Sequence, residues 1–472
     1  MNMRIEADSI GTLAVPTEAY YGVQSSRAKE NFSITGTNLH PELISNLARI
    51  KKAAAVVNAQ SGNLAVGKKD AIVQACDEIV AGYFNEAFIV DAIQGGAGTS
   101  ANMNANEVIA NRAIEILGGR KGDYRIVHPN DDVNLCQSTN DVFPTAGKMT
   151  VLQLLPELIA ELEKLELALA DKAKEFAGVI KMGRTQMQDA VPTTLGRTFQ
   201  AYQSFVKRDI RHLMSAAEEM KSLNLGGTAI GNAINATPEY LENITAFVSA
   251  EVGIAFTQAE DLFDATQHVD GFVRVSAAIK TAAVNLSKMS NDLRLLSSGP
   301  RAGIGEINLP AKQNGSSIMP GKVNPVIPEV VSQVAFRVIG NDLTITMAAE
   351  SGQLELNAFE PIIFHSLFES IDCLAHAVAT LTVNCITGIQ ANEMACYKHV
   401  EESAGIATAL CPTIGYQQAS AIAKESLKTG KTVRELVLEK GLFSVEETDS
   451  ILDLKRMAGI PAELVLLAGK AV

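Results

Sequence analysis

The stretch VLQLLPELIAELEKLELAL, residues 151–169, decides how this chain folds. Its apolar residues recur at steps of three and four: Leu152, Leu155, Leu158, Ile159, Leu162, Leu165 and Leu169. This spacing places them on one face of an α-helix. A second run, from Leu262 to Leu296, repeats the pattern, so the sequence predicts long amphipathic helices through most of residues 142–395.

Two further helices, expected at residues 328–349 and 361–389, are apolar around much of their circumference. A helical segment of about 30 residues is about 45 Å long, which is more than a compact single domain needs. Apolar surface in excess on a long helical bundle requires partner subunits. The sequence therefore predicts a homo-oligomer whose core is made of pooled helices.

The parts of the chain on either side of this region have a different character. Residues 1–140 mix loops with short helices, which we expect at 41–58 and 68–84, and residues 396–472 read as short helices separated by glycines. The prediction is a mainly α protein of three domains: a mixed helical and loop domain (1–140), a central bundle (141–395) and a small C-terminal helical domain (396–472).

Composition limits the classes of function. The 472 residues carry a net charge of −13, which argues against a nucleic-acid surface, and 47% of them are hydrophobic, enough to fill several cores. The six cysteines are scattered without a C-x-x-C pair, which indicates reduced thiols and no metal cluster. The chain start lacks an apolar signal core, and no uninterrupted apolar run reaches about eighteen residues. A cytoplasmic protein is expected.

The polar segment GSSIMPGKVNP, residues 315–325, has the composition of a loop that surrounds an anion. Its two glycines permit close backbone approach, and its two prolines prevent helix formation. Its polar side chains are Ser316, Ser317, Lys322 and Asn324. They offer hydroxyls, one positive charge suited to a carboxylate or phosphate, and an amide. A packed core does not need this mixture of residues. The alternative to a binding loop is an ordinary surface turn, because glycine- and serine-rich turns are common on protein surfaces.

Two glycine motifs come close to nucleotide-binding signatures without matching them. In the 315–325 segment five residues lie between the two glycines, where a P-loop has four, and Lys322 precedes Val323, so a P-loop fails on spacing and on the magnesium hydroxyl. The segment 94–101 formally fits a dinucleotide fingerprint. Polar residues follow it where an apolar helix should pack on a sheet, so a polar pocket wall containing Thr99 is the better interpretation.

Three other polar segments lie between the predicted helices. Residues 136–141, CQSTND, have the composition of a helix N-cap, and the helix N-terminus that follows attracts anions. Residues 183–192 and 225–232 interrupt the helical pattern. Each could be a connector, but the charge of Arg184 among amide and hydroxyl side chains makes a binding role equally compatible with the sequence.

Taken together, these segments resemble the motifs of the aspartase/fumarase superfamily of lyases. The shared positions are Gly98-Thr99-Ser100, Ser138, Asn140-Asp141, Gly183-Arg184-Thr185, the 315–325 segment and Glu329. The aspartase form is favoured over the fumarase form by Tyr20-Tyr21-Gly22, by Cys136 to Asn140 and by the run from Pro325 to Leu354. The resemblance covers the chain from Arg4 to the last forty or so residues.

The resemblance implies an ammonia-lyase that interconverts L-aspartate with fumarate and ammonia, with a fumarase-type hydratase as the alternative. It implies that Ser316, at the head of a flexible lid, is the catalytic base, and that the other site residues bind substrate. Those expected on the β-carboxylate are Thr99, Ser138, Thr139 and Ser317; those on the α-carboxylate are Lys322 and Asn324; those near the amino group are Asn140, Thr185 and Gln186.

The family builds each site from several subunits, so the resemblance also implies a homotetramer. No cofactor motif is present; a divalent-cation activator stays compatible with the sequence, because surface carboxylates leave no readable pattern. One position departs from the family: many relatives carry histidine where this chain has Gln186, and a neutral amide cannot relay a proton. A non-catalytic helical scaffold would share the bundle but would not need Ser316, Lys322 and Asn324 in one loop.

Overall fold

The computed structural model of the protein describes residues 2–460, which form two compact units. The first unit comprises the residues up to Ile159, Arg211–Ala283 and Phe336–Leu374; the second comprises Ala160–Ile210, Val284–Ala335 and the residues from Ala375 onward. The division into three domains at residues 140 and 395 stays a prediction, and residues 461–472 of its last domain lie outside the described residues.

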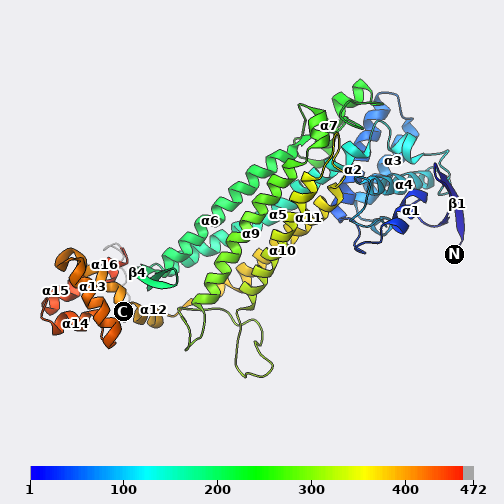
Figure 1. The fold of residues 1–472 in the computed structure, drawn as a ribbon. Helices are drawn as coiled ribbons and strands as arrows, with labels where there is room; N and C mark the ends of the chain where they lie inside the picture. The colour runs from blue at the N-terminus through cyan, green and yellow to red at the C-terminus, as the bar shows by residue number, and fades with distance from the viewer. Residues whose placement is uncertain (1, 461–472) are drawn as a thin grey trace. The chain divides into compact units, whose positions relative to one another are not determined.

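The first unit begins with a β-hairpin that the sequence did not reveal. Strands β1 (Met3–Asp8) and β2 (Gly11–Pro16) pair antiparallel, with Met3 opposite Pro16 and Asp8 opposite Gly11 (Figure 1). Each strand is only six residues long, half of its residues are exposed, and its sequence lacks the sustained apolar alternation that marks a half-buried strand. The Arg4 guanidinium ties the hairpin to the following segment through the carbonyls of Pro16 and Ala19, at 2.9 and 2.8 Å.

Short helices, two-residue strands and one π-helical turn make up the rest of this unit outside the long helices. They are α1 (Val23–Asn31), α2 (Pro41–Gln60), α3 (Val66–Val80), η1 (Asn85–Ala87), α4 (Thr99–Ile116), η2 (Pro129–Val133), η3 (Glu218–Lys221), β5 (Ser222–Leu223), α7 (Pro238–Val252), β6 (Thr257–Gln258) and α8 (Leu262–Gln267). The helices expected at 41–58 and 68–84 are α2 and α3.

Helix α4 is buried although its sequence is polar. Asn104 and Asn106 are fully buried, and Glu107 is 1% exposed. The Glu107 carboxylate accepts the backbone N–H of Gly22 and the hydroxyl of Ser25, and the Asn104 amide donates to a backbone carbonyl. The polar residues therefore fasten α4 to the irregular segments around it.

Five long helices run through the middle of the described chain: α5 (Thr139–Glu175), α6 (Leu195–Ala217), α9 (Asp270–Leu296), α10 (Val326–Glu350) and α11 (Glu360–Asn384) (Figure 1). The mainly α fold class and the predicted helical periodicity are confirmed. In α5 the leucines at steps of three and four are buried, as at Leu155, Leu158 and Leu162. Lysines in its last turn complement the negative end of the helix.

Aromatic rings hold α5, α9 and α11 together within the first unit. The ring of Phe364 lies 4.9 Å from that of Phe143 and 5.0 Å from that of Phe272, measured between centroids. Gly147 of α5 faces the same ring, and a Cβ there would collide with it. This close contact requires glycine, because the backbone of α5 lies directly against the ring of Phe364.

The second unit carries a β-hairpin and a set of short helices. They are β3 (Ile180–Thr185), β4 (Gln188–Thr194), β7 (Ile307–Asn308), η4 (Ile386–Gly388), β8 (Gln390–Ala391), α12 (Glu393–Glu401), η5 (Ala404–Leu410), α13 (Cys411–Thr429), α14 (Val433–Glu439), α15 (Val445–Ile451) and α16 (Leu454–Met457). Buried residues of the C-terminal helices, such as Val400, Leu410 and Leu436, pack in one cluster with Met182 of β3. The base of the hairpin is thus part of this C-terminal core.

Helix α11 is the most apolar of the long helices. Among the described residues, the segment Glu360–Gly388 is long and apolar enough to cross a membrane by length and composition, and 61% of its most apolar window is buried inside the fold. Such burial is typical of a core helix. All six cysteines are free thiols, four of them buried, as the scattered spacing predicted.

Candidate active site

The N-terminus of α5 presents three of the predicted residues. The Ser138 hydroxyl accepts the backbone N–H of Asn140 at 3.2 Å, and the Asn140 amide donates to the carbonyl of Ala229 at 2.8 Å. The Thr139 hydroxyl accepts from the amide of Asn102 at 3.1 Å. Each side chain is half-buried, so it is held from within the fold and keeps one face accessible.

Asp141 fixes the geometry of this helix start. It is fully buried, and its carboxylate accepts the backbone N–H groups of Ser138 at 3.0 Å, Gly226 at 3.0 Å and Thr228 at 3.1 Å. Burial raises the pKa of this carboxyl to about 6, and the three N–H donors act in the opposite direction. The loop at residues 225–232 is therefore fastened to α5 by one carboxylate.

A buried amide network lies beneath Thr139. The Oδ1 atom of Asn134 accepts from Lys51 Nζ at 2.7 Å and from the amides of Asn102 and Asn106, both at 3.2 Å. Lys51 is fully buried, and burial lowers its pKa to about 7. Asn102 bridges this network to the Thr139 hydroxyl, so the orientation of Thr139 depends on residues of α2 and α4.

Thr99 begins helix α4. Gly98 before it has φ of +87°, in the left-handed region, and a Cβ on Gly98 would collide with the ring of Phe143. The Thr99 side chain is exposed, and its hydroxyl donates to the carbonyl of Gly96 at 2.7 Å. The glycines thus serve a tight turn into a helix N-terminus, where backbone N–H groups favour an anion.

In the loop of residues 315–325, backbone N–H groups of the loop donate to the hydroxyl of Ser316. The Oγ atom of Ser316 accepts the backbone N–H groups of Ile318 at 3.2 Å and Met319 at 2.9 Å. Two N–H donors on one hydroxyl oxygen stabilise the deprotonated form of that hydroxyl. Ser316 is half-buried, whereas Ser317 and Lys322 are exposed.

The two ends of this loop are joined at a narrow neck. The N–H of Gly315 donates to the Lys322 carbonyl at 2.9 Å, and the Asn324 amide donates to the Gly315 carbonyl at 2.7 Å. A Cβ on Gly315 would lie 2.6 Å from the Lys322 carbonyl oxygen, so the neck requires glycine. Asn324 therefore uses one of its two amide N–H donors within the loop, and the second is a donor that a carboxylate can accept.

Thr185 and Gln186 lie at the tip of the β3–β4 hairpin, and both are exposed. Thr185 pairs with Gln188 across a two-residue turn, in which Gln186 and Met187 have φ of +52° and +65°. Positive φ at both central positions is typical of a type I′ turn, which favours glycine and asparagine. The neighbouring Arg184 binds the carboxylate of Glu306 at 2.7 Å.

The structure thus places the predicted residues in separate groups. Thr99, Ser138, Thr139 and Asn140 belong to the first unit; Thr185, Gln186, Ser316, Ser317, Lys322 and Asn324 belong to the second. Within the first group, the Asn140 N–H donates to the Ser138 hydroxyl and Asn102 donates to Thr139, whereas the Thr99 hydroxyl donates to Gly96. Within the described second unit, no hydrogen bond joins the hairpin tip to the 315–325 loop.

Sequence reasoning missed three groups that contact these residues or their neighbours: the buried carboxylate of Asp141, Lys51 in the network beneath Thr139, and Glu306 beside Arg184. For Lys51 a signal existed, since a lysine amid apolar residues of a predicted helix is a candidate buried charge. The contacts of Asp141 with Gly226 and Thr228 join residues about 85 positions apart, and no local pattern reports such a pairing.

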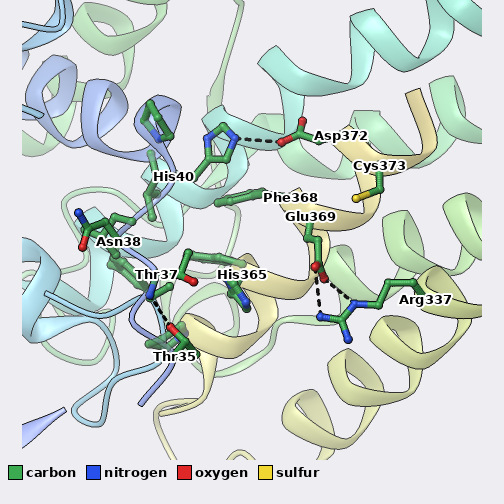
Figure 2. A pocket seen from close by; sticks show the side chains of 17 residues that line it. Thr35, Thr37, Asn38, His40, Arg337, His365, Phe368, Glu369, Asp372 and Cys373 are labelled. Atoms are coloured by element: carbon green, nitrogen blue, oxygen red, sulfur yellow. Dashed lines mark hydrogen bonds and ion pairs between the residues drawn. The ribbon is translucent and has the colours of Figure 1, made fainter. Parts of the chain in front are cut away.

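A cavity of about 590 Å³ in the first unit contains none of the predicted residues (Figure 2). On its walls the Nε2 atom of His40 lies 3.1 Å from Asp372, and Arg337 contacts both oxygens of Glu369, at 3.0 and 3.1 Å. These four side chains are paired two by two, and much of the remaining lining is aromatic or aliphatic, which does not suit a small dicarboxylate.

Comparisons with known proteins agree with the motifs. A family model described as lyase matches residues 11–340, and a second, described as fumarase C C-terminus, matches residues 406–459. The aspartate ammonia-lyase of Helicobacter pylori is 53% identical over 457 residues, covering 96% of this chain and 98% of the relative. The aspartate ammonia-lyase of Bacillus subtilis is 49% identical over 450 residues, covering 95% of each chain.

Solved structures share the fold over nearly the whole chain. A fumarate lyase:delta crystallin from Brucella melitensis bound to cobalt has a TM-score of 0.94 and 50% identity, covering 97% of this chain and 100% of that one. A class II fumarase from Schistosoma mansoni has a TM-score of 0.93 and 35% identity, with 97% and 99% covered. With relatives at about half identity over almost its full length and a lyase family model over residues 11–340, the chain belongs to the aspartate ammonia-lyase family of the aspartase/fumarase superfamily.

Proposed function

We propose that the protein catalyses the reversible elimination of ammonia from L-aspartate to give fumarate. The observation that carries this assignment is the identity of 49 to 53% with aspartate ammonia-lyases over about 95% of the chain. The class II fumarase that shares the fold is more distant, at 35%. The reaction removes a proton from C3 and ammonia from C2, and it needs no oxidant or reductant.

The main difficulty of this reaction is the negative charge that develops on the β-carboxylate, and the proposed contacts to that carboxylate would stabilise it. When the C3 proton leaves, the adjacent carboxylate becomes an aci-carboxylate with two negative charges, which only preorganised donors can stabilise. In our proposal Thr99, Ser138, Thr139 and Ser317 hold that group. The anchoring of Thr139 by Asn102 supports this role, because it fixes the hydroxyl before substrate arrives.

Ser316 is the proposed base. A serine hydroxyl is a poor base at its ordinary pKa, so the site must stabilise the alkoxide. The N–H groups of Ile318 and Met319, which donate to the Ser316 oxygen, are suited to do so. Substrate binding and closure of the loop would exclude water and strengthen both contacts. In the step itself the C3 proton moves to Ser316, and its bonding pair moves into the aci-carboxylate.

Lys322 and Asn324 are proposed to hold the α-carboxylate, with Asn140, Thr185 and Gln186 near the amino group. Ammonium and hydroxyl at C2 are the only difference between aspartate and malate, so these last three residues carry the discrimination. Amide and hydroxyl oxygens accept N–H bonds from an ammonium group, whereas a protonated histidine at position 186 would repel it.

We further propose a cytoplasmic homotetramer with sites shared between subunits and no cofactor. Large apolar side chains remain exposed along one face of α10, at steps of three and four: Phe336, Ile339, Leu343 and Met347. Three of them are more than 60% exposed, which is unusual for a stable solvent-facing helix. Light scattering of the purified protein would measure the assembly, and Leu343→Glu should dissociate it.

The test of function is a direct assay of fumarate absorbance with purified protein. We expect fumarate from L-aspartate, none from D-aspartate and essentially none from L-malate, because a site built to bond one substituent rejects an analogue lacking the right donors by about 10⁴-fold or more. Faster turnover of L-malate than of L-aspartate would overturn the assignment and favour the fumarase-type hydratase.

A further inference from the structure

A cluster of charged side chains lies behind the β3–β4 hairpin, centred on a buried carboxylate. Glu306 has a fully buried side chain. Its Oε1 atom lies 2.7 Å from Nη1 of Arg184 and 3.3 Å from Nδ1 of His399, and its Oε2 atom lies 3.2 Å from Nζ of Lys181. Lys181 and Arg184 belong to the hairpin and His399 to helix α12, so a single carboxylate connects the hairpin to the C-terminal helices.

Glu306 is itself held firmly. Its backbone N–H donates to the carbonyl of Leu296 at 2.9 Å, and its own carbonyl accepts the N–H of Asn392 at 2.9 Å. A carboxylate can only accept hydrogen bonds, so a hydrogen bond from His399 requires the proton on Nδ1. A fixed acceptor thereby sets the orientation of both Arg184 and the His399 ring.

The second strand of the hairpin has its own attachment to the C-terminal segment. The Ser403 hydroxyl donates to the Asp189 carboxylate at 2.8 Å and accepts the N–H of Gly405 at 3.1 Å. A Cβ on Gly405 would lie 2.8 Å from the carbonyl oxygen of Ala190, so the two segments are in close contact. Arg184 and Asp189 flank the turn and lie 3.9 Å apart, Nε to Oδ1; Arg184 also binds Glu306, and Asp189 also binds Ser403.

The turn between them needs such support. Gln186 and Met187 both have positive φ, a region that residues with side chains rarely adopt and that persists when the surrounding structure determines it. The turn also presents Thr185 and Gln186 as exposed side chains. Their direction therefore depends on how firmly Arg184 and Asp189 are held.

We infer that Glu306 and His399 are positioning residues for the amino-group end of the site. Acting through Arg184, they orient the Thr185–Gln186 turn toward the C2 substituent of the substrate. The inference rests on the proposed function, in which Thr185 and Gln186 contact the amino group while other residues hold the carboxylates. It predicts that removing a contact of Glu306 raises KM for ammonium far more than KM for fumarate.

The experiment measures the reverse reaction, addition of ammonia to fumarate, with His399→Leu and His399→Gln. We expect His399→Leu to raise KM for ammonium by about tenfold, because small misplacements of contact groups are costly, and to leave KM for fumarate within about twofold. His399→Gln keeps an N–H donor for Glu306 and should restore most of the ammonium KM. Lys398→Ala, on the same helix and 67% exposed at its side chain, is the matched control.

Equal changes in the two KM values, or no change in either, would overturn the inference, because a general structural defect does not single out ammonia. If His399→Leu fails to fold, Ser403→Ala provides the second test through Asp189, and the same KM split is required of it. The wild-type protein separates the two hypotheses. If it forms fumarate from L-aspartate but the variants show no split, the proposed function survives and the positioning role does not.

Discussion

The start of helix α5 and the 315–325 loop both carry predicted substrate contacts, yet the chain holds them in opposite ways. Around Ser138 to Asp141 the partners come from distant parts of the first unit, including Asn102, Gly226 and Ala229. In the described chain, every hydrogen bond of residues 315–324 stays between residues 315 and 326. One region is fastened to the core, and the other is fastened only to itself.

The difference matches two chemical tasks. Groups that stabilise a doubly charged carboxylate act best when their positions are fixed beforehand. A base that must be shielded from water has to admit substrate first and then close over it. Changes in the fastened region should therefore alter stability as well as activity, whereas changes in the loop should alter activity alone.

The largest expected effect is that of Ser316→Ala. Removing the proposed base should lower kcat by about 10³-fold or more, since general-base catalysis contributes up to about 10⁴-fold. Helix content by circular dichroism and oligomer mass should stay unchanged, because in the described chain residues 315–324 make no hydrogen bond beyond residue 326. Ser33→Ala, at an exposed serine outside the predicted site, controls for the substitution itself. Retention of more than a small fraction of kcat would reject Ser316 as the base.

Lys322→Ala should have the next largest effect. A lost charge-assisted contact to a carboxylate is worth roughly 1.5 to 3 kcal/mol, which corresponds to about a 10- to 150-fold drop in kcat/KM. Unfolding in urea should be unchanged. Lys312→Ala, an exposed lysine just before the loop, is the control. Equal kinetic constants for the two variants would place Lys322 outside the site.

Asp141→Asn tests the fastened region. An amide in place of the carboxylate leaves at least one buried N–H among those of Ser138, Gly226 and Thr228 poorly paired, at a cost of roughly 1 to 3 kcal/mol in the free energy of unfolding. Both the urea midpoint and kcat/KM should fall. Asp261→Asn, at an exposed helix N-cap, should be nearly neutral. A loss of activity with full stability would mean that this region is no more fastened than the loop.

Glu360→Gln tests a buried carboxyl group at the start of α11, in the first unit, through the pH dependence of stability. Burial raises the pKa of Glu360 to about 8, from an ordinary value of 4.5, although Lys148 pulls it down. Between these values the folded protein keeps a proton that the unfolded chain releases, so stability falls by about 1.4 kcal/mol per pH unit from this group as pH rises, and the contribution is lost above pH 8. Glutamine stays neutral, so the variant should show a flatter dependence of urea midpoint on pH.

The control for this last change is Glu355→Gln, at an exposed glutamate near the end of α10. It should keep the wild-type pH dependence. A steep pH dependence retained in Glu360→Gln would show that another buried group is responsible.

The sequence alone predicted the long helices well, because each carries its own periodicity over many turns. It also predicted that residues 315–325 form a loop and that a helix begins near residue 142, where α5 begins at Thr139. It did not reveal strands β1 and β2. Each has only six residues, half of them exposed, which is too short a stretch to show alternation of apolar and polar residues. Nor did it reveal that Asp141 binds Gly226, or that Glu306 binds Arg184, since such pairings depend on folding distant segments together.

The narrow neck of the 315–325 loop has a consequence for limited proteolysis. Ile318 at the tip is 84% exposed, whereas Gly315, Lys322 and Asn324 tie the two ends together. A protease that cuts at the tip would leave both ends attached, so the nicked protein should keep its folded mass. It should also lose turnover, because the donors of Met319 and Ile318 would no longer be held against Ser316. A ligand that closes the loop should slow the cut, which makes cleavage rate a direct reporter of closure.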